Sequence, residues 1–499
     1  MIGKAGAGKT AAIINEIKRD MASAHGRALM IVPEQYSHEA ERELCRVCGD
    51  RLSLYAEVLS FTGLARETAA KHGGGAEPWL DKGGRLLCMA LALQSVGSRL
   101  RIYSAAQRRA ELQALLLSAV DELKSACIGY DALMSAASAC PDSLGDKLSD
   151  LALILEAYDA AVANGHADPA DRLSILAGQI DENTDIDGSV KIYVDGFIDF
   201  TRQEREILHA MLRRGAQLTV CLTVDALDGD NEIFELSRRA GRELLAYARE
   251  LGAEAEIVTL SEQSAKAPEL TVFADNMFSY SSDKYTPARD AIRLYRTESM
   301  AAECEQAAAL CLEFVRDGGC RWRDIAVVAR GFEDYRGSLE SAFRHYGVPL
   351  FTARRDDLMS KPLPALISLA YEIVCGGWAV DDVISYMRTG LAGLSPDECD
   401  ALENYIFKWQ LQGGAWHRSA DWHQHPDGYG CEYTDETEET LRRVNALRRT
   451  LAAPLLAFEE ASSKAQTAAQ QAEALAGLFK ALALPEQLSR RAGELAQLG

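Results

Sequence analysis

Short apolar runs alternate with helix-like stretches through the first half of the chain. Residues 28–32 (ALMIV), 190–194 (VKIYV) and 218–223 (LTVCLT) have strand character. Continuous apolar runs of this length are typical of parallel strands buried on both faces. Between the last two runs, Thr201-Arg-Gln-Glu204 is a capping box that opens an amphipathic helix. Strands separated by helices predict a parallel α/β sheet.

A long helical segment interrupts this alternation. Residues 58–59 predict the end of another strand, and a helix follows them after Ser60-Phe61-Thr62. From about residue 78 the sequence becomes rich in Ala and Leu with polar residues at intervals. We interpret this stretch, at about 78–175, as a helical subdomain inserted into the α/β domain.

A second α/β pattern begins after a stretch without clear period at 261–289. Residues 292–295 and 325–329 (IAVVA) are expected to be strands, and 300–316 a helix. Ser395-Pro-Asp-Glu398 is a further capping box, with proline at the first helical position. An irregular loop rich in Trp, His and Gly covers 413–435, and we expect its tryptophans to pack on the helices around it. The rest of the chain has helical composition.

These patterns predict three parts. Residues 1–285 form a first α/β domain with the helical insertion, 286–375 begin a second α/β domain, and 376–499 form a truncated helical subdomain. Only two residues precede a glycine-rich loop at 3–10, although the strand that holds such a loop needs roughly 4–8 apolar residues. We therefore expect the sequence to be a fragment.

The glycine-rich loop matches the phosphate-binding pattern G-x-x-x-x-G-K-[ST] at every position. It consists of Gly3, Lys4, Ala5, Gly6, Ala7, Gly8, Lys9 and Thr10. In such loops backbone N–H groups curl around phosphates, the lysine reaches the terminal phosphates, and the Ser or Thr hydroxyl ligates Mg²⁺. We predict that the loop binds ATP and Mg²⁺, with Lys9 as a catalytic group and Thr10 as a metal ligand. A glycine-rich turn that matches by chance is the alternative, and the motif does not separate ATP from GTP.

A carboxylate ends the apolar run at 190–194. Asp195 stands where phosphate-loop proteins hold Mg²⁺, so we predict that it is a metal ligand and a catalytic residue. Its alternative role is to cap the turn after the strand. Gly196 follows, and glycine has no side chain that could orient or deprotonate an attacking water. Losing such a base typically costs about 10²–10⁴ in rate, so the sequence predicts nucleotide binding with weak or absent turnover.

Composition restricts the partners and the compartment. The chain has 53 Lys and Arg against 74 Asp and Glu, a net charge of −21. This acidity argues against a protein that coats nucleic acid with its whole surface, but a local basic groove stays compatible with it. The 12 cysteines are scattered and no secretory leader or membrane-length apolar run is present. We therefore expect reduced thiols, a cytoplasmic location and no membrane partner.

Several stretches in order resemble one bacterial family: GKAGAGKT, IVPEQYSHEAERELC, AEVLSFTGLARE, IYVDGFIDFTRQE and LENYIFKWQLQGGAW. They are similar to the B subunit of AddAB-type helicase–nucleases, over most of the chain. In superfamily-1 helicases of the UvrD type, the second acidic motif reads Val-Asp-Glu-Phe-Gln-Asp. Val194, Asp195, Phe197 and Asp199 match this motif, and the catalytic glutamate falls on Gly196.

The resemblance implies a superfamily-1-like P-loop NTPase fold, in which 1–285 and 286–375 belong to two RecA-like domains with parallel sheets. It implies ATP and Mg²⁺ as cofactors, and single- or double-stranded DNA as a ligand. It also implies a heterodimer with a helicase–nuclease A subunit. By similarity, Ser60, Phe61 and Thr62 lie in a DNA-contacting motif, where a hydroxyl donates to a phosphate; alternatively Phe61 is a core residue. Arg330 corresponds to an arginine that reaches the γ-phosphate in related helicases, and alternatively is a surface residue. The family's nuclease domain and iron–sulfur cluster are assigned to no residue here.

These observations favour a subunit of an ATP-dependent helicase–nuclease complex in double-strand-break repair and recombination. It would bind ATP and scan single-stranded DNA, with impaired hydrolysis. The alternative is an active superfamily-1 helicase motor, in which Asp199 or a residue outside this sequence supplies the base. A P-loop small-molecule kinase is disfavoured by the second α/β pattern.

Overall fold

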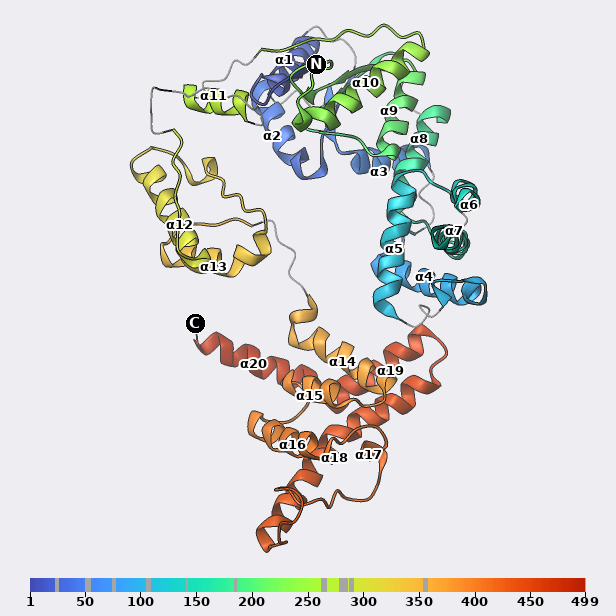
Figure 1. The fold of residues 1–499 in the computed structure, drawn as a ribbon, viewed down its shortest axis with the longest axis vertical. Coiled ribbons are helices and arrows are strands. Elements are labelled where there is room, and N and C mark those ends of the chain that lie inside the picture. Colours follow the sequence, from blue (N-terminus) through green and yellow to red (C-terminus); the bar gives the residue numbers. More distant parts are fainter. Residues whose placement is uncertain are drawn as a thin grey trace. The chain divides into compact units, whose positions relative to one another are not determined.

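The computed structural model describes residues 1–22, 27–49, 55–73, 78–104, 109–140, 142–183, 186–261, 267–277, 286, 291–352 and 358–498. They belong to two compact units, Met1–Tyr295 and Arg296–Gly499. Both units are rich in helices, and all strands found among the described residues lie in the first (Figure 1). The predicted junction at 261–289 lies partly outside the described residues, and its described part contains helix α11 (Pro268–Asn276).

The first unit is built on parallel strands. These are β1 (Ile2–Gly3), β2 (Arg27–Ile31), β3 (Ala56–Leu59), β4 (Val190–Val194), β5 (Gln217–Val220) and β6 (Leu222–Thr223). One ladder has the order β3-β2-β4-β5 and a second pairs β1 with β6, all in parallel. Only Cys221 separates β5 from β6, and its N–H donates to Val194 O at 2.8 Å while Leu222 N–H donates to Met1 O at 3.0 Å. The two ladders therefore continue into each other, and the predicted parallel α/β sheet is confirmed.

Successive residues of the central strands β2 and β4 pack alternately into two different hydrophobic cores. Met30 and Tyr193 pack with Ile13 and Ile17 of α1 and Leu44 of α2. Leu29, Ile31, Ile192 and Val194 instead join a core with α3, α8, α9 and α10. Because successive side chains of a strand point to opposite faces, both faces of the sheet are covered by helices.

The helices of this unit fall into two groups. Those that cover the sheet are α1 (Lys9–Ala22), α2 (Ser37–Cys48), α3 (Phe61–His72), α8 (Arg172–Asn183), α9 (Arg202–Arg213) and α10 (Glu235–Glu250). Between β3 and α8 the chain forms α4 (Lys82–Val96), α5 (Ala110–Ser125), α6 (Tyr130–Ala139) and α7 (Ser143–Val162), which share a hydrophobic core of their own. The capping box at Thr201 and Glu204 is present at the start of α9, as the sequence predicts.

The second unit is helical in its described part. Its helices are α12 (Met300–Arg316), α13 (Phe332–His345), α14 (Pro362–Gly376), α15 (Val380–Arg388), α16 (Pro396–Trp409), α17 (Gly414–His417), α18 (Asp435–Lys464), α19 (Ala468–Ala481) and α20 (Leu484–Leu498). The helix predicted at 300–316 is confirmed, and so is the capping box at Ser395 and Glu398. Trp416 and Trp422 are buried against these helices, as expected for the loop at 413–435.

Two strand predictions are wrong. Residues 292–295 and 325–329 form neither strand nor helix in the described part of the chain. An apolar run becomes a strand only when a neighbouring backbone completes its ladder. Residues 326–329 make no backbone hydrogen bond within the described ranges, and Val328 is 91% exposed.

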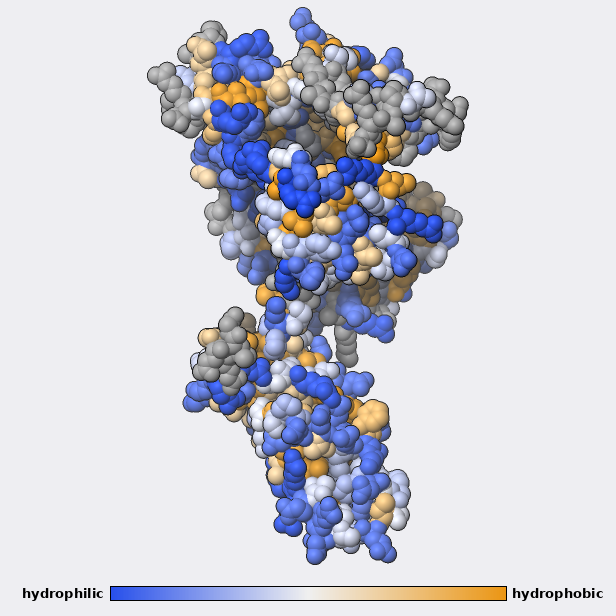
Figure 2. Space-filling view, turned by 90° about the vertical axis from the view of Figure 1, so that its left-hand side faces the viewer, coloured by the Kyte–Doolittle hydropathy of each residue, from blue (hydrophilic) through white to orange (hydrophobic). Residues whose placement is uncertain are grey.

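The surface drawn in Figure 2 is mostly hydrophilic, with hydrophobic residues gathered in small patches. Among the described residues, no helix combines the length and the apolar character that crossing a bilayer requires.

Candidate functional site

The glycine-rich loop connects β1 to α1 and needs its glycines at three places. Gly6 and Gly8 have φ values of 87° and 80°, in the left-handed region that side chains disfavour. A Cβ at Gly3 would lie 2.7 Å from Leu260 O. The Ala7 N–H donates to Lys4 O at 3.2 Å, which closes the loop into a tight turn. Glycine is therefore strongly favoured over any larger residue at these three positions of the loop.

Lys9 begins α1 and curls over the loop. Its ammonium donates to Gly3 O at 2.7 Å and to Lys4 O at 3.0 Å. Burial lowers the pKa of Lys9, while the nearby Cys221 and Asp195 act in the opposite direction. The side chain thus presents a cation beside the loop and the end of β4.

Thr10 and Asp195 meet although 185 residues separate them. The Thr10 hydroxyl donates to Asp195 Oδ2 at 2.5 Å. Asp195 follows β4 and is 7% exposed, and its N–H donates to Ile31 O at 3.0 Å, which continues the ladder with β2. The sheet therefore brings the end of β4 to the start of α1. A hydroxyl and a carboxylate at this separation offer two oxygen ligands to a hard cation such as Mg²⁺.

A cavity of about 570 Å³ lies beside these residues, and we call it the loop cavity. Its walls come from the loop and α1, from the end of β4, from β6 and from α2. The predicted site residues that line it are Ala5, Gly6, Gly8, Lys9, Thr10 and Asp195. Gly3, Lys4 and Ala7 do not line it: Ala7 is buried, and Lys4 forms an ion pair with Asp275 at 2.6 Å.

Gly196 lines the loop cavity directly after Asp195. Its φ is +86°, and a Cβ at this position would lie 3.1 Å from Pro33 Cδ. The absence of a glutamate is therefore accompanied by a backbone conformation that favours glycine.

Asp199 is engaged elsewhere. Its Oδ2 accepts a hydrogen bond from Arg239 Nη2 at 2.9 Å, and its Oδ1 accepts one from Phe200 N–H at 2.8 Å. Asp199 does not line the loop cavity. Its carboxylate is thus held by α10 and is not presented to that cavity.

The predicted DNA-contacting residues begin α3. The Ser60 hydroxyl caps this helix by accepting from Gly63 N–H at 3.0 Å, and it lies 2.9 Å from the Thr62 hydroxyl. Phe61 is 4% exposed, so it is a core residue of this unit. Its ring lies edge-on to Phe197 at 5.4 Å between centroids. Since Phe197 also lines the loop cavity, the start of α3 and the cavity share one aromatic contact.

Arg330 lies in the second unit, two residues before α13, and its side chain is exposed. The strand that it was expected to end is not formed. The contact of Arg330 with a γ-phosphate therefore stays a prediction from the resemblance.

Sequence reasoning missed the contribution of α2 and β6 to the loop cavity. Tyr36, Glu39, Arg42, Glu43, Cys221 and Thr223 all line it. Burial, followed by the charge of Asp195, raises the pKa of the Cys221 thiol to about 12, so the thiol stays neutral. Residues 37–48 form α2, but no local signal in the sequence shows which of its faces meets the loop.

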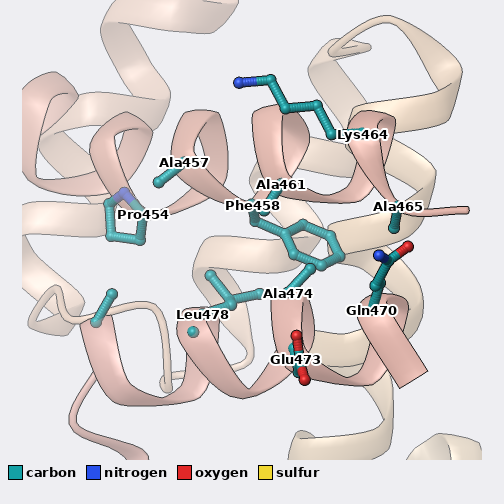
Figure 3. A pocket seen from close by; sticks show the side chains of 12 residues that line it. Pro454, Ala457, Phe458, Ala461, Lys464, Ala465, Gln470, Glu473, Ala474 and Leu478 are labelled. Atoms are coloured by element: carbon teal, nitrogen blue, oxygen red, sulfur yellow. The ribbon is translucent and has the colours of Figure 1, made fainter. Parts of the chain in front are cut away.

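Another cavity, of about 450 Å³, lies between α18 and α19 in the second unit. Figure 3 shows Phe458 and Leu478 inside it, with Gln470 and Glu473 at one side. Most of its other lining residues are alanines. No group of three or more His, Cys, Asp or Glu side chains suited to a metal ion occurs among the described residues.

Comparison with known proteins gives a consistent result. Residues 1–273 match the family model described as "ADDB, N-terminal". The chain is 32% identical over 519 residues to the B subunit of the ATP-dependent helicase/deoxyribonuclease of Desulforudis audaxviator, covering 99% of this chain and 44% of that protein. It is 29% identical over 498 residues to the protein of the same name from Acetivibrio thermocellus, covering 97% of this chain and 43% of that protein. The chain therefore spans less than half the length of these relatives.

Proposed function

Since this chain belongs to the AddB N-terminal family, we propose that it is the nucleotide- and DNA-binding part of the B subunit of an ATP-dependent helicase–nuclease complex. The resemblance to superfamily-1 proteins supports a P-loop NTPase fold with RecA-like domains. Its described parallel sheet, with the glycine-rich loop between β1 and α1, supports that assignment. In such a complex the chain would act in double-strand-break repair and recombination, with a helicase–nuclease A subunit as its partner.

The contact between Thr10 and Asp195 carries the proposal of nucleotide binding. The two oxygens lie 2.5 Å apart at the wall of the loop cavity, and Lys9 lies on the same wall. This donor set fits Mg²⁺ with ATP, since carboxylate and hydroxyl oxygens are ligands that a hard cation prefers. When bound, the cation would neutralise phosphate charge. Lys9 would bind the terminal phosphates, and the loop N–H groups would hold the inner ones.

Weak turnover is the second part of the proposal. Hydrolysis needs a base or an orienting group near the attacking water, and Gly196 has no side chain to offer one. Asp199, the substitute that an active motor would use, is paired with Arg239. We infer that the protein binds ATP to set its conformation and hydrolyses it slowly, which suits a role in scanning DNA.

DNA binding is assigned to the start of α3. Ser60 and Thr62 carry hydroxyls there, and donors of this kind position a DNA strand through its phosphates without reading sequence. The Phe61–Phe197 contact offers a route by which a ligand of the loop cavity could alter this segment. The assignment of Arg330 to the γ-phosphate rests on the resemblance. An Arg330→Ala variant with unchanged affinity for ATP would contradict that assignment.

The proposal is tested by titrating the chain with the fluorescent methylanthraniloyl derivative of ATP (mant-ATP) in Mg²⁺. Lys9→Ala should weaken binding at least about tenfold, because a charge-assisted contact to phosphate is lost. Lys18→Ala is the matched control, since Lys18 is an exposed lysine of the same helix that does not line the loop cavity. Phosphate release with single-stranded DNA should stay far below one turnover per second.

Equal affinity of the Lys9→Ala and Lys18→Ala variants would contradict nucleotide binding at this loop. Brisk DNA-stimulated turnover would instead contradict the assignment of a slow scanning role and favour the motor.

A further inference from the structure

One face of α2 contributes charged side chains to the loop cavity. Glu39, Arg42 and Glu43 line it, while Leu44 of the same helix is buried in the core that α1 and α2 form against the sheet. The spacing of three and four residues places the charged side chains on one side of the helix. The cavity therefore has a second charged wall, which α2 forms and which is separate from the glycine-rich loop.

The partners of these side chains differ. Glu43 is bound by Arg46 through two hydrogen bonds, of 2.9 and 2.6 Å. Arg42 makes no hydrogen bond or ion pair within the described part of the chain, and it attracts Glu43 only at longer range. Arg42 does not pair with Glu39, although that residue lies one turn away on the same wall. The guanidinium is thus an uncommitted cation at the loop cavity.

We propose that Arg42 is a second cationic contact for the bound nucleotide and favours the triphosphate over the diphosphate. This inference rests on the proposed nucleotide binding at the loop cavity. A guanidinium presents planar N–H donors that match phosphate oxygens and keeps its charge at all relevant pH values. In the proposed complex the loop amides would hold the inner phosphates and Lys9 would reach the terminal ones from the side of α1. A cation on another wall of the cavity is therefore expected to contact the additional phosphate of the triphosphate. It would raise the affinity for ATP more than the affinity for ADP.

The opposite charge on the same wall should have the opposite effect on binding. Glu39 makes no ion pair or hydrogen bond among the described residues and lines the same cavity. A carboxylate near a polyphosphate repels it, and removing this charge should strengthen binding. We therefore expect weaker binding for Arg42→Ala and tighter binding for Glu39→Gln.

The experiment titrates the full chain with mant-ATP and with mant-ADP in Mg²⁺. Arg42→Ala should raise the Kd for mant-ATP about tenfold or more, as expected for a lost charge-assisted hydrogen bond, and change the Kd for mant-ADP by less than about threefold. Arg42→Lys should fall between the wild type and the alanine variant, because the charge stays but the planar fork is lost. Glu39→Gln should lower the Kd for mant-ATP.

Arg46→Ala is the matched control. Arg46 is an exposed arginine one turn further along the same helix, and it does not line the loop cavity. Its removal leaves the Glu43 carboxylate without its partner, so it should weaken both nucleotides slightly and to a similar degree, without the loss of preference for mant-ATP expected for Arg42→Ala. Thermal unfolding of the two alanine variants should coincide. An Arg42→Ala variant that keeps its affinity for mant-ATP, or weakens both nucleotides equally, overturns the inference.

The two proposals fail in different ways. If the wild type binds mant-ATP and Lys9→Ala does not, nucleotide binding stands whatever Arg42→Ala shows. If wild type and Lys9→Ala bind equally weakly, nucleotide binding fails and the role of Arg42 fails with it.

Discussion

Restoring the missing carboxylate at Gly196 should not restore hydrolysis. A Gly196→Glu substitution places a side chain on a residue whose φ is +86°. A side chain in this left-handed conformation leaves Cα in a different direction from one on extended or right-handed backbone, so we expect this carboxylate not to reach the position of a catalytic base. We therefore expect phosphate release with single-stranded DNA to stay at the wild-type level, within about threefold.

The same substitution should lower stability. A non-glycine residue in the left-handed region costs about 1–2 kcal/mol. The new Cβ would also lie 3.1 Å from Pro33 Cδ, so the proline ring must shift slightly. For a domain of this size each kcal/mol lowers Tm by about 2–4 °C. Thermal unfolding followed by circular dichroism should therefore show a decrease of about 2–8 °C for the unit that contains the sheet.

Two further variants separate backbone strain from chemistry. Gly196→Ala should lose a similar amount of stability, because the cost arises at Cβ and not at the carboxylate. Gly178→Ala is the control, since Gly178 lies inside α8 and a Cβ there would meet no atom within 4 Å; alanine should be neutral or slightly stabilising there. A Gly196→Glu variant that keeps the wild-type Tm and hydrolyses ATP at one turnover per second or more would refute the reasoning.

Three other predictions follow from contacts of the first unit. Asp199→Ala should leave ATP turnover unchanged and lower the free energy of unfolding by at most about 1 kcal/mol, because its pair with Arg239 is partly exposed. A drop in turnover would instead support the alternative of an active helicase motor. Cys221, whose pKa burial raises to about 12, should react with iodoacetamide at pH 8.5 far more slowly than the same thiol in the urea-unfolded chain, and equal rates would contradict its burial. Asp168 has no exposed side-chain surface and bonds to the buried Lys124 at 3.1 Å, so Asp168→Asn should destabilise the helices of 82–162 by about 3–5 kcal/mol in urea titrations.

Asp168 also gives the stability a pH dependence. Burial by itself raises the pKa of this carboxyl, but a backbone N–H from Ala170 and the charges of Lys124 and Arg85 lower it below its ordinary value. A carboxyl with a lowered folded-state pKa stabilises the protein above its unfolded pKa of about 3.9. This contribution should disappear as the pH falls below about 4, and the Asp168→Asn variant should lack that part of the acid transition.

The sequence by itself determined the features that depend on neighbours within a few residues. The apolar runs at 28–32 and 190–194 became β2 and β4, and the capping box at Thr201 and Glu204 was formed. Gly6 and Gly8 of the loop at 3–10 were required by local backbone geometry. Each of these signals is contained in a single segment, because helical period, strand burial and turn conformation are set by adjacent residues.

Only the tertiary structure decided how separate segments meet. The ladder of β2 with β4 brings Asp195 to Thr10, and the packing of α2 places Arg42 at the loop cavity. The strand-like run at 325–329 pairs with no other described strand, although its composition resembles that of β2. A run of apolar residues indicates that a segment can be buried, but the strand that pairs with it must come from another part of the chain. Pairing, register and the identity of facing side chains are therefore properties of the folded molecule and not of any one segment.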